Sequence, residues 1–178
     1  MGTFFNNETK KWEQKVFPLP DVLYDRASGR AYRKYQKHVI LRKWMDKRKI
    51  KKLNAVHYFD KWQLYQKLSK YEEVRPYLPE TRLYKPGAVK KMLKKYPAIY
   101  LKATVSSRGK RVMRLSKDGK YYRFSAFRNN LVSGILKKPK EIDVLVSKFF
   151  GNDTIIMQQA IPLVQIDNGN VDMRATVQ

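Results

Sequence analysis

The stretch AIYLKATVSSRGKRVMRLSKDGKYYRF, residues 98–124, carries the clearest fold signal in the chain. Residues 98–102 form a short apolar run typical of a buried strand, and a polar, glycine-bearing turn separates it from a second strand at 112–115. Asp118 and Gly119 then form a dipeptide that favours a tight hairpin before a third strand at 121–124. The stretch therefore predicts consecutive strands with a long basic loop between the first two.

Helices bounded by proline and glycine flank these strands. The segment 86–96 has apolar residues at i, i+3, i+4 and i+7 and stops at Pro97, while the segment 139–150 begins with Pro139 and ends before Gly151. The apolar positions are Val89, Met92, Leu93 and Tyr96 in the first helix, and Ile142, Leu145, Val146 and Phe149 in the second. With a further strand at 154–158, the pattern predicts mixed α/β structure.

The N-terminal part combines a strand with basic helices. Two prolines exclude a helix at the start of 17–26, which ends as a short strand. In the Lys- and Arg-rich segment 30–52, apolar residues recur at helical spacing, so one face is expected to be buried. These residues are Tyr35, Val39, Ile40 and Trp44. The cationic faces fit either a solvated helix or a surface that binds polyanions. Asp60 and Gln63 resemble a capping box that starts another helix at 60 or 61.

Charge is the strongest compositional signal. Lys and Arg number 39 against 15 Asp and Glu, which gives a net charge of +24, whereas small soluble domains usually carry about 2–8. Such a field favours anionic partners, whether nucleotide, nucleic acid or acidic polymer. The chain has no cysteine, which excludes disulfides and thiolate chemistry, and its two histidines, His38 and His57, have no metal-ligand spacing. No apolar run is long enough to cross a membrane, and no secretion signal is recognised.

Several segments, taken in order, resemble ATP-grasp proteins of the endospore coat-associated family. They are FPLPDVLYDR at 17–26, FDKW at 59–62, LPETRLY at 78–84, YLK at 100–102, MQQAIPL at 157–163 and DMR at 172–174. The resemblance implies a basic N-terminal α/β segment at 1–56 and an ATP-grasp nucleotide-binding region at 57–178. The second region would hold the nucleotide-binding subdomain and the start of the second ATP-grasp subdomain.

The same resemblance implies a set of nucleotide-binding residues. They are Lys61, Lys102, Ser107, Gly109, Gln158, Gln159, Ile161, Asp172 and Arg174. Both lysines would reach phosphate oxygens, for which an ammonium supplies three charge-assisted donors. The loop 104–111 would close over the phosphates, although only Gly109 remains where the family has several glycines. Residues 158–161 would read the adenine edge, and the D-x-R segment would face the nucleotide. No residue is assigned a catalytic role.

Three functional hypotheses remain open at this stage. The first is an ATP-binding protein related to carboxylate–amine ligases that act through an acyl phosphate. Because the Glu and Asn ligands for Mg²⁺ in complete relatives are not found before Gln178, the chain is expected to be truncated and inactive alone, which leaves its status as an enzyme open. The second is a structural or interaction protein of the spore coat without nucleotide turnover. The third is a basic protein that binds nucleic acid or another polyanion.

The hypotheses share expectations about partners and location. Beside nucleotide, the partners would be acidic coat components or other polyanions, with no membrane involved. A C-terminal strand at 171–178 would expose an apolar face and an unpaired edge, which favours self-association. The family resemblance implies a cytoplasmic protein of the sporulating cell that associates with the spore coat and is not secreted.

Overall fold

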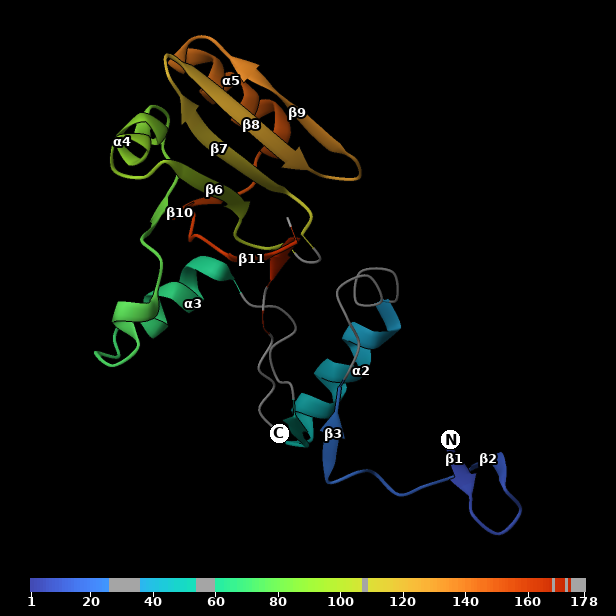
Figure 1. Ribbon diagram of the computed structural model, residues 1–178. Helices are drawn as coiled ribbons and strands as arrows, with labels where there is room; N and C mark the ends of the chain where they lie inside the picture. Colours follow the sequence, from blue (N-terminus) through green and yellow to red (C-terminus); the bar gives the residue numbers. More distant parts are fainter. Residues whose placement is uncertain (26–35, 54–59, 107–108, 168, 172, 174–178) are drawn as a thin grey trace. The chain divides into compact units, whose positions relative to one another are not determined.

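The strands expected within residues 98–124 form the centre of a six-stranded sheet in the computed structural model (Figure 1). Every pair of neighbouring strands is antiparallel. In spatial order the strands are β5 (Thr81–Leu83), β10 (Ile155–Gln159), β6 (Ala98–Ala103), β7 (Val112–Asp118), β8 (Tyr121–Phe127) and β9 (Leu131–Leu136). The sequence prediction of mixed α/β structure is confirmed, and the Asp118–Gly119 hairpin joins β7 to β8, with Gly119 at φ 57°.

The structure describes residues 1–25, 36–53, 60–106, 109–167, 169–171 and 173. The chain divides into two compact units, Met1–Tyr58 (unit 1) and Phe59–Gln178 (unit 2). The six-stranded sheet belongs to unit 2.

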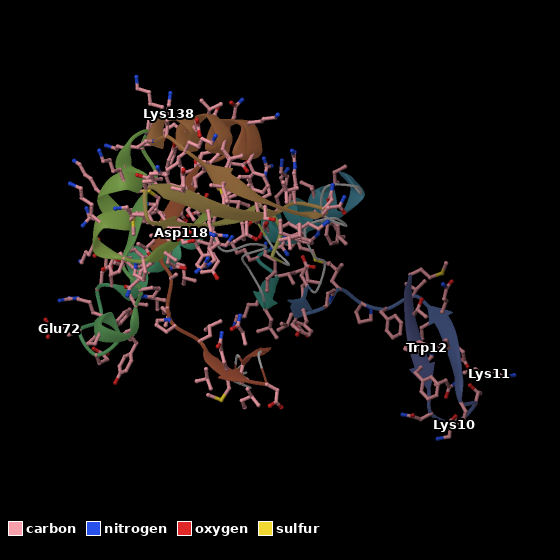
Figure 2. The ribbon with its side chains drawn as sticks, turned by 45° about the horizontal axis from the view of Figure 1, so that its top comes forward. Lys10, Lys11, Trp12, Glu72, Asp118 and Lys138 are labelled. Carbon is pink, nitrogen blue, oxygen red and sulfur yellow. The ribbon has the colours of Figure 1, made fainter. Side chains whose placement is uncertain are left out.

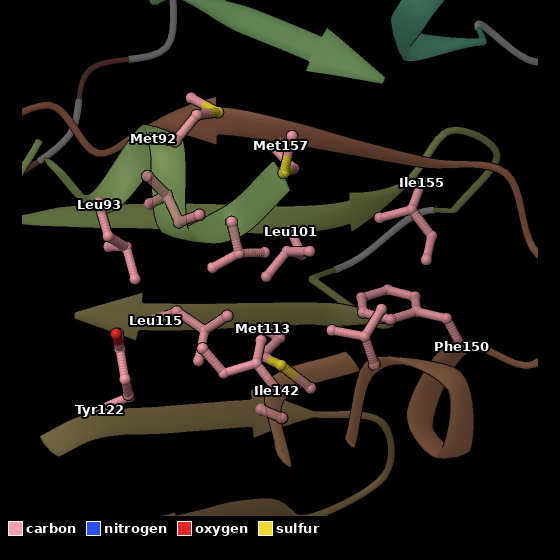
Figure 3. Packing of buried hydrophobic residues seen from close by; sticks show 14 of the residues in the cluster. Met92, Leu93, Leu101, Met113, Leu115, Tyr122, Ile142, Phe150, Ile155 and Met157 are labelled. Atoms are coloured by element: carbon pink, nitrogen blue, oxygen red, sulfur yellow. The ribbon is translucent and has the colours of Figure 1, made fainter. Parts of the chain in front are cut away.

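Two helices cover one face of this sheet and close the core. They are α4 (Ala88–Lys95) and α5 (Pro139–Phe150), in agreement with the predicted segments. Figure 3 shows Leu101 of β6 and Met113 of β7 packed with Ile142 of α5, and all three are buried. The predicted face of α5 needs one correction: Phe150 is fully buried, whereas Phe149 is only partly so, and their rings meet edge to face 4.8 Å apart.

The opposite face of the sheet, called the outer face below, carries the polar residues. In β6, Ile99, Leu101 and Ala103 point into the core, so Tyr100 and Lys102 lie on the outer face. The alternation of side chains therefore gives this short strand one face in the core and one face with partly exposed residues.

The edge strands β5 and β9 were not predicted from the sequence. Gly134 interrupts the apolar run of β9 and weakens its strand signal. In the sheet, a Cβ at Gly134 would lie 2.8 Å from the Phe124 ring of the neighbouring strand. The glycine thus makes room for an aromatic side chain that packs against the core.

In its described residues, 1–25 and 36–53, unit 1 contains two small strand pairs and a helix. A hairpin joins β1 (Gly2–Asn6) to β2 (Lys11–Lys15), and β3 (Val22–Tyr24) pairs in parallel with β4 (Lys51–Leu53), with α2 (Gln36–Lys47) between them in sequence. Figure 2 shows the side chains of Lys10, Lys11 and Trp12 on the hairpin. The Trp12 ring is 71% exposed, with its edge against Phe5.

The buried face of α2 differs from the predicted stripe. Arg42 and Met45 are buried, whereas Ile40 is 64% exposed. The reason is a buried ion pair between Arg42 and Asp25, which turns that face of the helix inward. Tyr35, at the start of the predicted stripe, lies outside the described residues.

The remaining elements of unit 2 include short helices and a hairpin. They are α3 (Lys61–Leu68), the 3₁₀ helix η1 (Arg75–Tyr77), and the strands β11 (Val164–Ile166) and β12 (Gly169–Val171), which pair with each other. Of the predicted C-terminal strand, Val171 belongs to β12 and Met173 is exposed, while 172 and 174–178 lie outside the described residues. None of the helices in the described part of the chain is long and apolar enough to cross a membrane.

Carboxylates hold the turns of unit 2 against its helices. Glu80, at the start of β5, accepts a hydrogen bond from the Tyr96 hydroxyl at 2.7 Å and pairs with Lys95 and Arg82. The contacts with Lys95 and then Tyr96 lower the pKa of Glu80 from its ordinary value of 4.5 to about 2. On α5, Asp143 accepts hydrogen bonds from the Tyr84 hydroxyl and the Gly87 N–H.

A Glu80→Gln substitution tests this anchor through pH. Because its folded pKa is lowered, Glu80 contributes stability above pH 4.5 that is lost as the pH falls towards 2. Since its cationic partners are exposed, we expect a cost of only about 1–2 kcal/mol at pH 7. The difference from the parent protein should shrink towards zero near pH 2. Urea unfolding followed by circular dichroism at several pH values measures it.

The matched control is Glu72→Gln, which makes the same charge change at an exposed site, labelled in Figure 2. A deficit in Glu80→Gln that stays constant from pH 7 to pH 2 would contradict the assignment.

Candidate functional site

Lys61 connects the start of α3 to the loop that follows β6. Asp60 caps the helix by accepting hydrogen bonds from the backbone N–H groups of Trp62 and Gln63 at 2.9 and 3.0 Å, as its position in the sequence predicted. The backbone N–H of Lys61 donates to the Thr104 carbonyl at 3.0 Å. The cap and this bond fix the direction in which the Lys61 side chain leaves the helix.

The Lys61 ammonium is surrounded by oxygen acceptors. Its Nζ lies 3.0 Å from the Ala103 carbonyl, 3.4 Å from the Thr104 carbonyl, and 2.9 and 3.0 Å from the carbonyl and Oγ of Ser106. Burial lowers the pKa of Lys61, and the adjacent Asp60 carboxylate raises it in opposition. The charge is therefore held in place by neutral dipoles.

Lys102 lies on the outer face of β6, one residue before this cluster. Its Nζ donates to Gln158 Oε1 at 2.6 Å and lies 5.3 Å from the centre of the Tyr100 ring. Gln158 in turn donates through Nε2 to the buried Thr81 hydroxyl at 3.0 Å. Burial and then the positive charge of Lys61 lower the pKa of Lys102. The structure thus brings Lys61, Lys102 and Gln158 together, as the resemblance implied.

The loop after β6 is anchored at both ends. Thr104 is buried and donates its N–H to the Thr154 carbonyl. At the other end, the Arg111 guanidinium pairs with Asp153 at 2.7 Å and donates to the Phe150 carbonyl at 2.7 Å. Arg111 therefore fastens the loop to the end of α5.

Two described loop residues have left-handed backbone geometry. Gly109, exposed at φ 68°, adopts it without strain, whereas Arg111 at φ 58° is a non-glycine residue in a region that costs about 1–2 kcal/mol. Of these two described left-handed positions, one is therefore occupied by a residue other than glycine. Ser107 lies outside the described residues.

A hollow of about 410 Å³ lies at the other end of β6, beside the end of β10. Tyr100, Arg114 and Ile161 contribute to its lining, together with 97–98 and 162–163. Ile161 is exposed, and the Ala160 N–H donates to the Ala98 carbonyl. We call this depression the hinge hollow, because it includes Ala160 and Ile161 of the hinge segment 158–161, which the resemblance assigns to the adenine edge.

Gln159 faces β5 rather than standing free. Its backbone N–H donates to the Glu80 carbonyl at 2.9 Å, and its Oε1 accepts from the Glu80 N–H at 3.2 Å. One acceptor of the Gln159 side chain is thus used within the fold.

Asp172 and Arg174 lie outside the described residues, as does His57, and the side chain of His38 is not described. In the part of the chain that is described, no three His, Asp or Glu side chains gather where they could hold a metal ion.

The sequence pattern missed Tyr100, Thr81, Ser106 and Arg114 as site residues. Strand alternation places Tyr100 on the same face as Lys102, so that signal was present. Arg114 lies directly opposite Tyr100 only because β7 pairs with β6 in this register. Thr81 and Ser106 act through contacts distant in sequence, which no local pattern encodes.

Together these groups form an elongated site along β6. One end offers two partly buried ammonium groups to an anion, and the other end offers a hollow bordered by the Tyr100 ring and apolar side chains. The arrangement suits a ligand with an anionic tail and a flat, largely apolar head.

Comparison of the chain with known proteins identifies a similar family. The model of the YheC/D-like ATP-grasp family matches residues 49–178. Over 115 residues the chain is 30% identical to the endospore coat-associated protein YheD of Bacillus subtilis (strain 168). The matched stretch covers 61% of this chain and 24% of the relative, so the chain spans about a quarter of that protein's length. No solved structure matches the chain.

A Lys61→Met substitution tests the role of Lys61 in ordering the loop. Methionine keeps the apolar stem but removes the donors to three carbonyls, each charged hydrogen bond being worth about 1.5–3 kcal/mol. We expect amide hydrogen exchange in residues 103–112 to accelerate about tenfold or more, as measured by mass spectrometry. Lys67→Met, at an exposed position of the same helix, is the matched control. Equal exchange in the two variants would contradict the role.

Proposed function

Because the chain belongs to the YheC/D-like ATP-grasp family, we propose that unit 2 binds ATP along the outer face of β6. The observation that carries this proposal is the approach of Lys61 and Lys102 to the same end of the strand, where each has a lowered pKa. Two partly buried ammonium groups that repel each other favour an anion between them. The triphosphate supplies that anion.

The base of the nucleotide fits the hinge hollow. Tyr100 lies two residues from Lys102 on the same face, about 7 Å along the strand, so a ligand in the hollow extends naturally towards the ammonium groups. The Tyr100 ring and Ile161 supply apolar contact. The Gln158 amide, held by Thr81, fixes the position of Lys102 at the ammonium end of the site.

Phosphate binding would also stabilise the charged form of the two lysines. A bound anion favours the charged form of both lysines and therefore raises their pKa values again. It would also compete with the loop carbonyls for the Lys61 ammonium. Binding would thus exchange contacts within the loop for contacts with phosphate, and the loop would shift as ATP enters.

As the reaction that such a nucleotide site would serve, we propose ligase chemistry of the carboxylate–amine type. A carboxylate oxygen would attack the γ-phosphorus, and ADP would leave with the electrons of the broken P–O bond. An amine would then attack the acyl carbon of the acyl phosphate, phosphate would leave with the electrons of the broken C–O bond, and the proton lost by the nitrogen would pass to phosphate or water. Lys61 and Lys102 are assigned only to binding, and Mg²⁺, when bound, would supply further charge neutralisation.

A second candidate is a coat interaction protein that keeps the fold without using nucleotide. It is favoured by the protein acceptors that already surround the Lys61 ammonium and by the anchoring of Arg111 to Asp153. The relative is named for its association with the endospore coat. On this proposal the chain works in the sporulating cell, where its positive charge would attract acidic coat components.

Nucleic-acid binding through the basic N-terminal segment receives less support. The Arg48 guanidinium covers the Trp44 ring at 3.7 Å, so that ring already has a stacking partner.

A Lys102→Ala substitution tests the first candidate. We expect the parent chain to bind ATP with Mg²⁺ in titration calorimetry, and the variant to bind about tenfold or more weakly, because one charge-assisted contact is lost. Lys94→Ala is the matched control, since Lys94 is exposed on α4, which packs against the core face. It should bind as the parent does.

The salt dependence separates the two candidates. ATP binding that persists at high salt and is lost in Lys102→Ala supports the nucleotide site, because partly buried contacts are less screened than surface ones. No ATP binding at any salt concentration, or equal weakening in both variants, would reject it and favour the interaction protein.

A further inference from the structure

A second hollow, of about 360 Å³, lies on the outer face over β7, β8 and β9. Arg114 borders both this depression and the hinge hollow, so the two are neighbours. We call it the arginine hollow. Its lining includes Arg114, Ser116, Arg123, Ser125, Ser133 and Ile135.

Strand register explains why these side chains meet. Directly paired residues of antiparallel strands lie on the same face. Arg114 pairs with Ser125, and Ser125 pairs with Ser133, which forms one row across three strands. The next row runs from Ser116 through Arg123 to Ile135. The two short serines at the β8 and β9 positions of the first row leave the depression beside the longer side chains of Arg114, Arg123 and Ile135.

The polar groups of the arginine hollow are mainly donors. The Arg123 Nε–H donates a hydrogen bond to the Asp118 carboxylate at 2.6 Å, which uses one of the five guanidinium N–H donors. Arg114 donates to the Ser116 hydroxyl at 3.4 Å. Asp118, labelled in Figure 2 at the β7–β8 hairpin, carries the opposing negative charge. Two arginines against one carboxylate leave a net positive charge, with serine hydroxyls beside it.

We propose that the arginine hollow is an accessory binding site for a small anion that carries a carboxylate or phosphate group. Guanidinium groups recognise both of these oxyanions through paired N–H donors, and serine hydroxyls add further hydrogen bonds. The depression is shallow and open, which fits a small ligand that lies across the strands. Anion binding in the arginine hollow does not depend on the proposed nucleotide site, whereas its accessory role rests on that proposal.

The register also separates this ligand from the phosphates of a bound nucleotide. The row that contains Lys102 continues through Val112 and Phe127 to Leu131, so beyond the lysine it is apolar. The rows of the arginine hollow begin instead at Tyr100 and Ala98, at the hinge end of β6. An anion there would lie beside the base rather than the phosphates. We therefore assign the arginine hollow to an accessory ligand and not to an acceptor of the phosphoryl group.

Nuclear magnetic resonance of the ¹⁵N-labelled 178-residue chain tests the proposal. Inorganic phosphate and succinate are titrated separately at constant ionic strength, and the amide signals of Ser125 and Ser133 are followed. We expect saturable shifts with at least one probe, and the same shifts in Lys102→Ala, in which the nucleotide site is impaired. A response to one probe alone identifies which oxyanion the site prefers.

Three variants sharpen the test. Arg123→Gln, which lies outside the hinge hollow, should weaken binding about tenfold. Asp118→Asn should preserve or tighten binding, because it removes the opposing charge. Lys120→Gln makes the same charge change as Arg123→Gln in the adjacent hairpin and should stay within about twofold of the parent, since general electrostatic attraction to one exposed lysine is weak.

Several results would overturn the accessory site. They are shifts that grow linearly without saturation, equal weakening in Lys120→Gln and Arg123→Gln, or shifts that disappear in Lys102→Ala. Unchanged signals elsewhere in the spectra of the variants establish that each variant is folded. ATP titration of Arg123→Gln keeps this result separate from the nucleotide proposal, because Arg123 borders only the arginine hollow.

Discussion

The Lys61 ammonium reaches the carbonyls of Ala103, Thr104 and Ser106, and through them it ties the start of α3 to the end of β6. Lys61 and these carbonyls are 42 to 45 positions apart in the sequence. The contact links the base of the loop to α3 and holds a positive charge beside Lys102. In the proposed nucleotide site, these carbonyls would compete with phosphate for the Lys61 ammonium, and the strength of the loop contacts would limit the affinity for phosphate.

The sequence was most informative where signals are local. The Asp60 cap, the Asp118–Gly119 hairpin and the apolar spacing of α4 each depend on residues a few positions apart, and the structure contains all three. The sequence pattern did not predict features that depend on contacts between residues distant in the sequence. β9 carries Gly134 because the Phe124 ring needs its space, and α2 turns Arg42 inward to meet Asp25. Neither partner can be read from a local window.

The same division applies to the site. Resemblance pointed to Lys61, Lys102 and Gln158, and contacts within unit 2 join them. Thr81, which orients Gln158, and Arg114, which borders both hollows, depend on strand order and register. Because β10 inserts between β5 and β6, residues 81, 102 and 158 meet despite their separation in the chain. Topology, rather than composition, selects which of the many cations form a site.

The distribution of carboxylates explains why the outer face stays cationic. In the described part of unit 2, Asp60 caps α3, Asp143 holds the turn before α4, and Asp153 fastens Arg111. Each of these three aspartates stabilises a junction between elements, while Lys102 receives a neutral amide partner and repulsion from Lys61. The chain has only 15 acidic residues against 39 basic ones. Acidic side chains that stabilise junctions between elements are not available to neutralise lysines and arginines on the surface. An external anion would neutralise the charges of Lys61 and Lys102 near the end of β6, which favours the proposed phosphate ligand over a neutral one.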